Sequence, residues 1–173
     1  MKKISLFLSA LLISAISMAA TVTMDFTSAA GLEAIGIPYP TKAENDGAYS
    51  SNLVIGQAYT QSGVALTVTK KGSTDTRIWL AAKGTMDLRH YKGGVLTFSA
   101  PAGSVITKIV FAGGSITGLE NLNNKTWEGT APSVDIPAAA GASTIKINTI
   151  TITYEASGAD VVATPIIRGE NDF

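Results

Sequence analysis

The chain has 173 residues, with 13 basic and 13 acidic side chains, one histidine and no cysteine. A chain without cysteine has no disulfide scaffold, no cysteine-ligated metal site and no thiol nucleophile. A single imidazole excludes a multi-histidine metal cluster, and a formal net charge of zero argues against nucleic-acid binding, which needs a basic excess. We expect no metal, no cofactor and no nucleic-acid partner.

The first 19 residues have the pattern of a secretory signal peptide. Lys2 and Lys3 form a positive start, residues 4–16 are apolar apart from serines, and Ser17-Met18-Ala19 supplies the small residues of a cleavage site. The apolar run is too short for a permanent membrane span. We expect cleavage after Ala19, a mature chain of 154 residues with a net charge of −2, no membrane insertion, and a secreted protein that is extracellular or periplasmic.

Alternation of apolar and polar residues predicts β-strands along most of the mature chain. An apolar residue at every second position places one row of side chains in a core and the other row in solvent. Such runs, separated by turn residues, occupy positions 21–26, 64–69, 86–91, 95–100 and 105–112. The run at 105–112 is so apolar that we expect it in the middle of a sheet, covered on both faces.

The last strand region changes phase near Asn148. Ile145 and Ile147 are odd-numbered, whereas Ile150 and Ile152 are even-numbered. One extra residue in a strand turns every later side chain to the opposite face. The change therefore requires either a β-bulge in a continuous strand, or a tight turn or sheet switch at Asn148.

Helix signals are few. Ser28 can cap a short helix that ends at Ile35, because Gly36 follows it. Residues 38–56 and 113–132 are rich in turn formers and polar groups, and they predict two long surface loops.

Many short strands and one short helix near the N-terminus indicate an all-β fold, an antiparallel β-sandwich of jelly-roll type. The mature length fits one domain with a self-sufficient core. We expect the sandwich over residues 20–155 and a linker or disordered tail over residues 156–173, where the alternation ends.

Several short motifs are shared with a known kind of domain. They are Arg77-Ile78-Trp79, LRHYKGG at 88–94, ITKIVF at 106–111, Trp127-Glu128-Gly129, Ser133-Val134 and ITITY at 150–154. As a set they resemble the jelly-roll, carbohydrate-binding-like β-sandwich modules of secreted and cell-surface proteins in Bacteroidetes-type bacteria. The resemblance covers residues 22–154 and implies a carbohydrate-binding or adhesion accessory, with no settled activity to carry over.

Three aromatic residues are the candidate ligand contacts: Trp79, Tyr91 and Trp127. The C–H groups on one face of a sugar ring match the π-face of an aromatic side chain. Trp127 is the first choice because it lies in a polar, asparagine-rich loop, and Arg77 and Arg89 would donate hydrogen bonds beside the other two. The alternative is that these rings fill the core or cap its edge.

Catalytic groups are scarce. Strand alternation turns His90 away from Arg89 and Tyr91 and toward packed neighbours, which disfavours a serine–histidine–aspartate arrangement. No motif nominates the carboxylate pair of a glycosidase, and the aspartates are too scattered to predict a calcium site. Asp87 shares the face of Arg89, where we expect a plain ion pair. The sequence therefore predicts that the chain is not an enzyme.

Taken together, these features predict a secreted, non-catalytic module that binds a glycan or another surface ligand. One alternative is a structural or adhesive cell-surface protein that acts through protein contacts, because an exposed strand edge can pair with another chain. The other is a fragment of a larger multidomain surface protein, since residues 163–167 resemble the start of a second β-domain. The sequence leaves the oligomeric state open.

Overall fold

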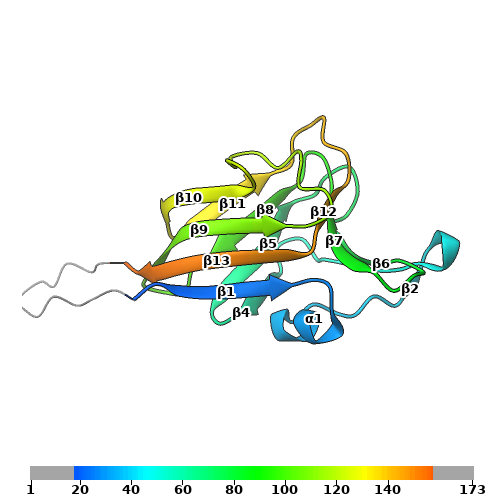
Figure 1. Ribbon diagram of the computed structural model, residues 1–173, viewed down its shortest axis with the longest axis horizontal. Coiled ribbons are helices and arrows are strands. Elements are labelled where there is room, and N and C mark those ends of the chain that lie inside the picture. The colour runs from blue at the N-terminus through cyan, green and yellow to red at the C-terminus, as the bar shows by residue number, and fades with distance from the viewer. Residues whose placement is uncertain (1–17, 158–173) are drawn as a thin grey trace, which may run out of the picture.

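The computed structural model describes residues 18–157 of the chain (Figure 1). The predicted signal peptide, apart from its last two residues, lies outside the described residues, and so does the predicted tail after Ser157. The strand that precedes this tail runs on to Ala156.

Antiparallel strands form three sheets and define the fold. The first sheet has the order β1 (Ala20–Asp25), β13 (Thr149–Ala156), β9 (Ser104–Ala112) and β10 (Thr126–Ala131). The second sheet has the order β11 (Ser133–Pro137), β8 (Val95–Ser99), β5 (Val64–Lys70) and β4 (Ala58–Gln61). The third sheet has the order β12 (Ile145–Ile147), β7 (Met86–His90), β6 (Arg77–Leu80), β3 (Tyr49–Asn52) and β2 (Lys42–Ala43). Besides the strands there are α1 (Ala29–Ile35) and a short 3₁₀ turn (Asn45–Gly47).

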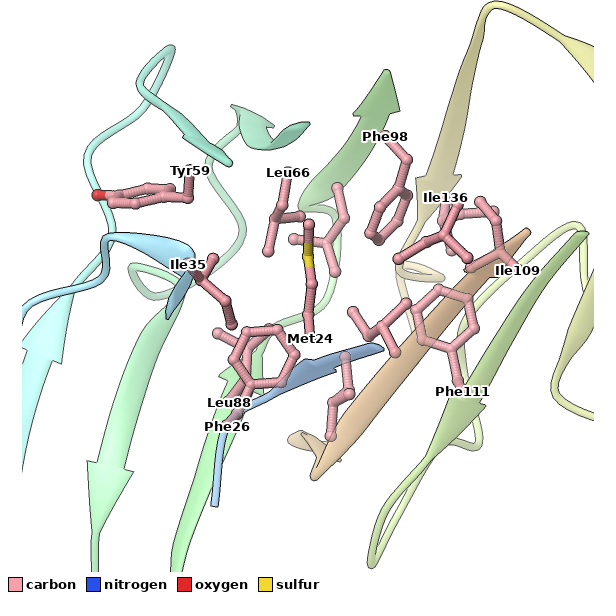
Figure 2. Close-up of a cluster of buried hydrophobic side chains, with 14 of the residues drawn as sticks. Met24, Phe26, Ile35, Tyr59, Leu66, Leu88, Phe98, Ile109, Phe111 and Ile136 are labelled. Carbon is pink, nitrogen blue, oxygen red and sulfur yellow. The ribbon is translucent and has the colours of Figure 1, made fainter. Parts of the chain in front are cut away.

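The first and second sheets form a sandwich around an apolar core. Figure 2 shows Phe98 and Ile136 from the second sheet pointing toward Ile109 and Phe111 from the first. The rings of Phe98 and Phe111 meet edge to face, with centroids 5.9 Å apart and an interplanar angle of 76°. This geometry is favourable for aromatic pairs and ties the two layers together. The all-β class, the sandwich-like architecture and the helix near the N-terminus are thus confirmed.

The helix α1 closes one side of the sandwich between two edge strands. It packs against β1, the edge of the first sheet, and β4, the edge of the second, with Leu32 and Ile35 buried. Its first turn is capped as predicted, because the Ser28 hydroxyl accepts a hydrogen bond from the Gly31 N–H at 3.0 Å. Gly36 ends the helix with a φ of 80°, a conformation that glycine adopts without strain.

A sheet switch explains the phase change near Asn148. Strand β12 pairs with β7 in the third sheet, whereas β13 pairs with β9 and β1 in the first. Between them, the Asn148 N–H donates to the Ala112 carbonyl at 2.7 Å, and the Asn148 carbonyl accepts from the Phe26 N–H at 2.9 Å. The chain therefore crosses from one sheet to the next at this residue, and the third sheet is joined to the sandwich.

Strand β9 is central in its sheet but is covered on one face only, so the prediction of two covered faces was wrong. Ile109 and Phe111 are buried, whereas Lys108 and Ala112 are exposed. The pairing of β9 with β13 shifts by one residue around Thr107, which turns Ile106 inward as well. Because of this bulge, buried residues of this run occur at both even-numbered and odd-numbered positions.

Both predicted loops contain strands. Residues 38–56 include β2 and β3, and residues 113–132 include β10. Strands β2 and β10 are edge strands, and both they and β3 are rich in polar side chains. These strands are defined by their backbone hydrogen bonds to a neighbouring strand. Such bonds do not require apolar and polar residues to alternate, so the sequence does not mark them.

Candidate functional site

Four of the five predicted ligand contacts lie together on the outer face of the third sheet. Arg77 and Trp79 come from β6, Arg89 comes from β7, and Tyr91 follows β7 directly. The antiparallel register places Arg77 opposite Arg89. The residues between them on each strand point inward and are buried, so these four point outward. We call this group of Arg77, Trp79, Arg89 and Tyr91 the aromatic–arginine face.

The members of the aromatic–arginine face stack on one another. The Arg89 Cζ atom lies 4.2 Å from the centroid of the Trp79 ring, and the Arg77 Cζ atom lies 5.1 Å from it. Arg77 Cζ is also 5.6 Å from the Tyr91 ring centroid, and Arg77 Nε donates to the Tyr91 hydroxyl at 3.0 Å. Cation–π contacts of this kind contribute about 0.5–1 kcal/mol each at exposed sites. The side chains therefore hold one another in a defined arrangement.

A carboxylate from the neighbouring hairpin supports Arg77. Glu44 Oε1 accepts a hydrogen bond from the Ser50 hydroxyl at 2.7 Å and forms ion pairs with Arg77 Nη1 and Lys42 Nζ, both at 3.4 Å. The Ser50 hydrogen bond lowers the pKa of Glu44, and the charges of Lys42 and Arg77 lower it further, although partial burial opposes them. Glu44 is therefore ionised at neutral pH.

Arg89 is held by a neighbour on its own strand. Its Nε atom donates to Asp87 Oδ1 at 3.1 Å, which is the ion pair that the strand alternation predicts. About a fifth of each of these two side chains remains accessible, with 21% for Arg89 and 20% for Asp87. The pair thus lies at the surface with most of both side chains covered.

Trp127, the first choice from the sequence, lies on a different sheet and faces inward. It pairs with the buried residue Ile109 across β10 and β9 and packs against the core. Gly129 lies under its ring, because a Cβ atom there would come 2.7 Å from the Trp127 Cζ2 atom. The alternative that a candidate ring caps the edge of the core applies to Trp127, which is partly buried and packs against the apolar cluster. Trp79 and Tyr91 are also partly buried, but they lie on the outer face of the third sheet.

The asparagine-rich loop beside Trp127 forms a polar concavity of about 410 Å³. Its lining residues are Asn121, Asn123, Asn124, Thr126 and Glu128. Two of these asparagines have a positive φ, 64° at Asn121 and 47° at Asn124, a conformation that asparagine tolerates better than most residues. The Trp127 ring does not line this hollow. The asparagine-rich loop and the ring are neighbours in sequence, but the loop lines the hollow and the ring packs against the core.

His90 is part of the core. It is fully buried, its Nδ1 atom lies 2.7 Å from the Thr76 hydroxyl, and its Nε2 atom has no hydrogen-bond partner in the described part of the chain. Burial lowers the pKa of His90 to about 4. An interaction with the backbone of Gly94 raises the pKa, but by less than burial lowers it. The prediction that His90 faces packed neighbours is confirmed, and its ring is neutral at neutral pH.

Sequence reasoning missed two charged residues near the aromatic–arginine face, Glu44 and Lys146. Glu44 reaches it through the pairing of β2 with β3 and of β3 with β6. Lys146 reaches it through the pairing of β12 with β7, which places it opposite Arg89. Both lie far from residues 77–91 in sequence, and no local pattern marks such long-range pairing.

Two further properties concern residues 18–157. Within this range no group of three or more histidine, aspartate or glutamate side chains is placed to hold a metal ion. No helix in the same range is long and apolar enough to cross a membrane.

Comparison with protein-family models, with curated proteins and with solved structures finds no match to this chain.

Proposed function

We propose that this chain is a secreted, non-catalytic β-sandwich module that binds a glycan or a related surface polymer through its aromatic–arginine face. The observation that carries the proposal is the outward placement of Trp79 and Tyr91 with two stacked arginines. None of these four side chains belongs to the buried apolar cluster of the described residues. Their arrangement is therefore in excess of what the core requires.

The chemistry of the face suits a sugar ligand. A sugar ring offers an apolar C–H face to an aromatic side chain and hydroxyl groups around its rim. Trp79 and Tyr91 supply the aromatic surface, while Arg77 and Arg89 supply donors and Asp87 supplies an acceptor beside them. Groups that are already held by stacking lose little conformational entropy when a ligand arrives.

Affinity gel electrophoresis of the mature chain in a panel of polysaccharides tests the proposal. We expect retention by at least one polysaccharide, weakened about tenfold by Trp79→Ala and by Tyr91→Ala, which corresponds to roughly 1.4 kcal/mol of binding free energy each. Tyr39→Ala is the matched control, because Tyr39 is 47% exposed and lies outside the third sheet. Migration unaffected by every polysaccharide would contradict the proposal, and so would retention that both site variants preserve.

A further inference from the structure

We infer that the aromatic–arginine face selects an acidic glycan, one that carries carboxylate or sulfate groups along its chain. The inference rests on the proposed function and names the ligand class of the same site. It is carried by a row of cationic side chains across three neighbouring strands, by the free donors of one arginine, and by the position of both relative to the aromatic rings.

The cationic row consists of Arg77 on β6, Arg89 on β7 and Lys146 on β12. Arg77 is directly opposite Arg89, and Arg89 is directly opposite Lys146. Like charges directly opposite one another in a sheet destabilise it. A row of three such residues therefore has an electrostatic cost in the free protein that an anionic ligand would offset.

The carboxylates within the described residues do not neutralise this row. Glu44 pairs with Arg77 but also with a fourth cation, Lys42, and Asp87 pairs with Arg89. Lys146 has no ion pair within residues 18–157. The row and its ion-paired neighbours thus comprise four cationic and two anionic side chains, a net charge of +2.

Arg89 has donors left for a ligand. Its hydrogen bond to Asp87 uses Nε, and within the described chain neither Nη1 nor Nη2 has a hydrogen-bond partner. The stacking of its guanidinium on Trp79, at 4.2 Å, limits the orientations of that planar group. A planar guanidinium with two free Nη groups matches the two oxygens of a carboxylate or sulfate, which accept parallel hydrogen bonds.

The arrangement favours an acidic polymer of sugars over other polyanions. Adjacent strands lie about 4.8 Å apart, so the three cations span roughly 10 Å, which is longer than one sugar ring. Trp79 and Tyr91 lie beside this row, so one ligand can place a ring on an aromatic face and an acidic group on Arg89. Nucleic acid needs a broad basic surface, which a balanced chain lacks.

The test compares pairs of polysaccharides that share a backbone, one member with acidic groups and the other without a charge. Polygalacturonate is paired with its methyl-esterified form for the carboxylate, and dextran sulfate is paired with neutral dextran for the sulfate. We expect the acidic member of at least one pair to bind at least about tenfold tighter, with an affinity that falls between roughly 50 and 500 mM salt. Arg89→Gln and Lys146→Gln should each reduce that preference about tenfold. Lys108→Gln, a lysine of the first sheet that pairs with Glu128, should leave it unchanged.

The outcomes separate the inference from the proposed function. Equal binding of both members of each pair, still weakened by Trp79→Ala, would overturn the acidic preference and leave the glycan-binding proposal standing. Retention by no polysaccharide would overturn both. Equal retention on double-stranded DNA would also overturn the inference, because the face would then be a general polyanion surface. Thermal unfolding of Arg89→Gln and Lys146→Gln checks that both variants are folded, and a reduced preference for the acidic polysaccharide in the folded Lys146→Gln variant supports the inference even if Arg89→Gln does not fold.

Discussion

Replacement of Phe111 by alanine is expected to lower the free energy of unfolding by about 3–5 kcal/mol. Phe111 is 1% exposed, and its ring meets that of Phe98 across the two layers of the sandwich. The substitution removes a large apolar surface from the core and leaves a cavity that the surrounding strands fill only in part.

Urea unfolding of Phe111→Ala, Phe98→Ala and the double variant measures this effect. The losses of unfolding free energy in the two single variants should not be additive, because the rings contact each other. A coupling free energy of about 0.5–1.5 kcal/mol is expected. Tyr49→Ala is the control, since Tyr49 is 44% exposed and its loss should change stability by less than about 0.5 kcal/mol. A loss below about 1 kcal/mol in Phe111→Ala would show that the two sheets do not share a packed core.

Acidification from pH 6.5 toward pH 4 is expected to remove roughly 3 kcal/mol of stability through His90. Burial lowers the pKa of His90 from 6.5 to about 4. Below pH 6.5 the unfolded chain takes up a proton on this histidine, whereas the folded chain does not until about pH 4. The unfolded state is thereby stabilised, and the free energy of unfolding falls as the pH decreases through this window.

The effect of His90 can be isolated because it is the one histidine in the sequence. The His90→Gln variant should have a lower but nearly constant stability between pH 6.5 and pH 5, measured by urea unfolding at a series of pH values. Asp25 and Glu44 have lowered pKa values in the folded chain. Their contribution to the free energy of unfolding is therefore present above their ordinary pKa values of 3.8 and 4.5 and is lost at more acidic pH. If the free energy of unfolding changes with pH equally in the wild-type chain and in His90→Gln above pH 5, the assignment to His90 is contradicted.

The parts of the fold that follow from the sequence are those in which burial creates a local pattern. The alternation at 64–69 and 95–100 predicts strands because Leu66 and Phe98 are buried on one face of a sheet. Ser28 and Gly36 predict the ends of α1 because each satisfies the helix backbone locally. Polar strands such as β2 and β10 are defined by backbone pairing with β3 and β9, and this pairing leaves no apolar alternation in their sequences.

The same distinction applies to the candidate site. The outward placement of Arg89 and Tyr91 follows from their spacing on one strand, and the inward placement of His90 follows with it. The convergence of Glu44, Arg77 and Lys146 depends on pairings among the five strands of the third sheet and was not predictable from any one of them. Trp127 shows the converse, because a polar sequence neighbourhood does not decide which way a side chain points from an edge strand.

The most direct test of the account is the fluorescence of single-tryptophan variants during titration with a polysaccharide that the wild-type chain retains. The sequence has two tryptophans, so Trp127→Phe leaves Trp79 as the reporter and Trp79→Phe leaves Trp127. Binding at the outer face of the third sheet predicts a saturable change in the emission of Trp79 and none in that of Trp127. A saturable change confined to Trp127, or none in either variant while the polysaccharide still binds, would contradict the placement of the binding site on the aromatic–arginine face.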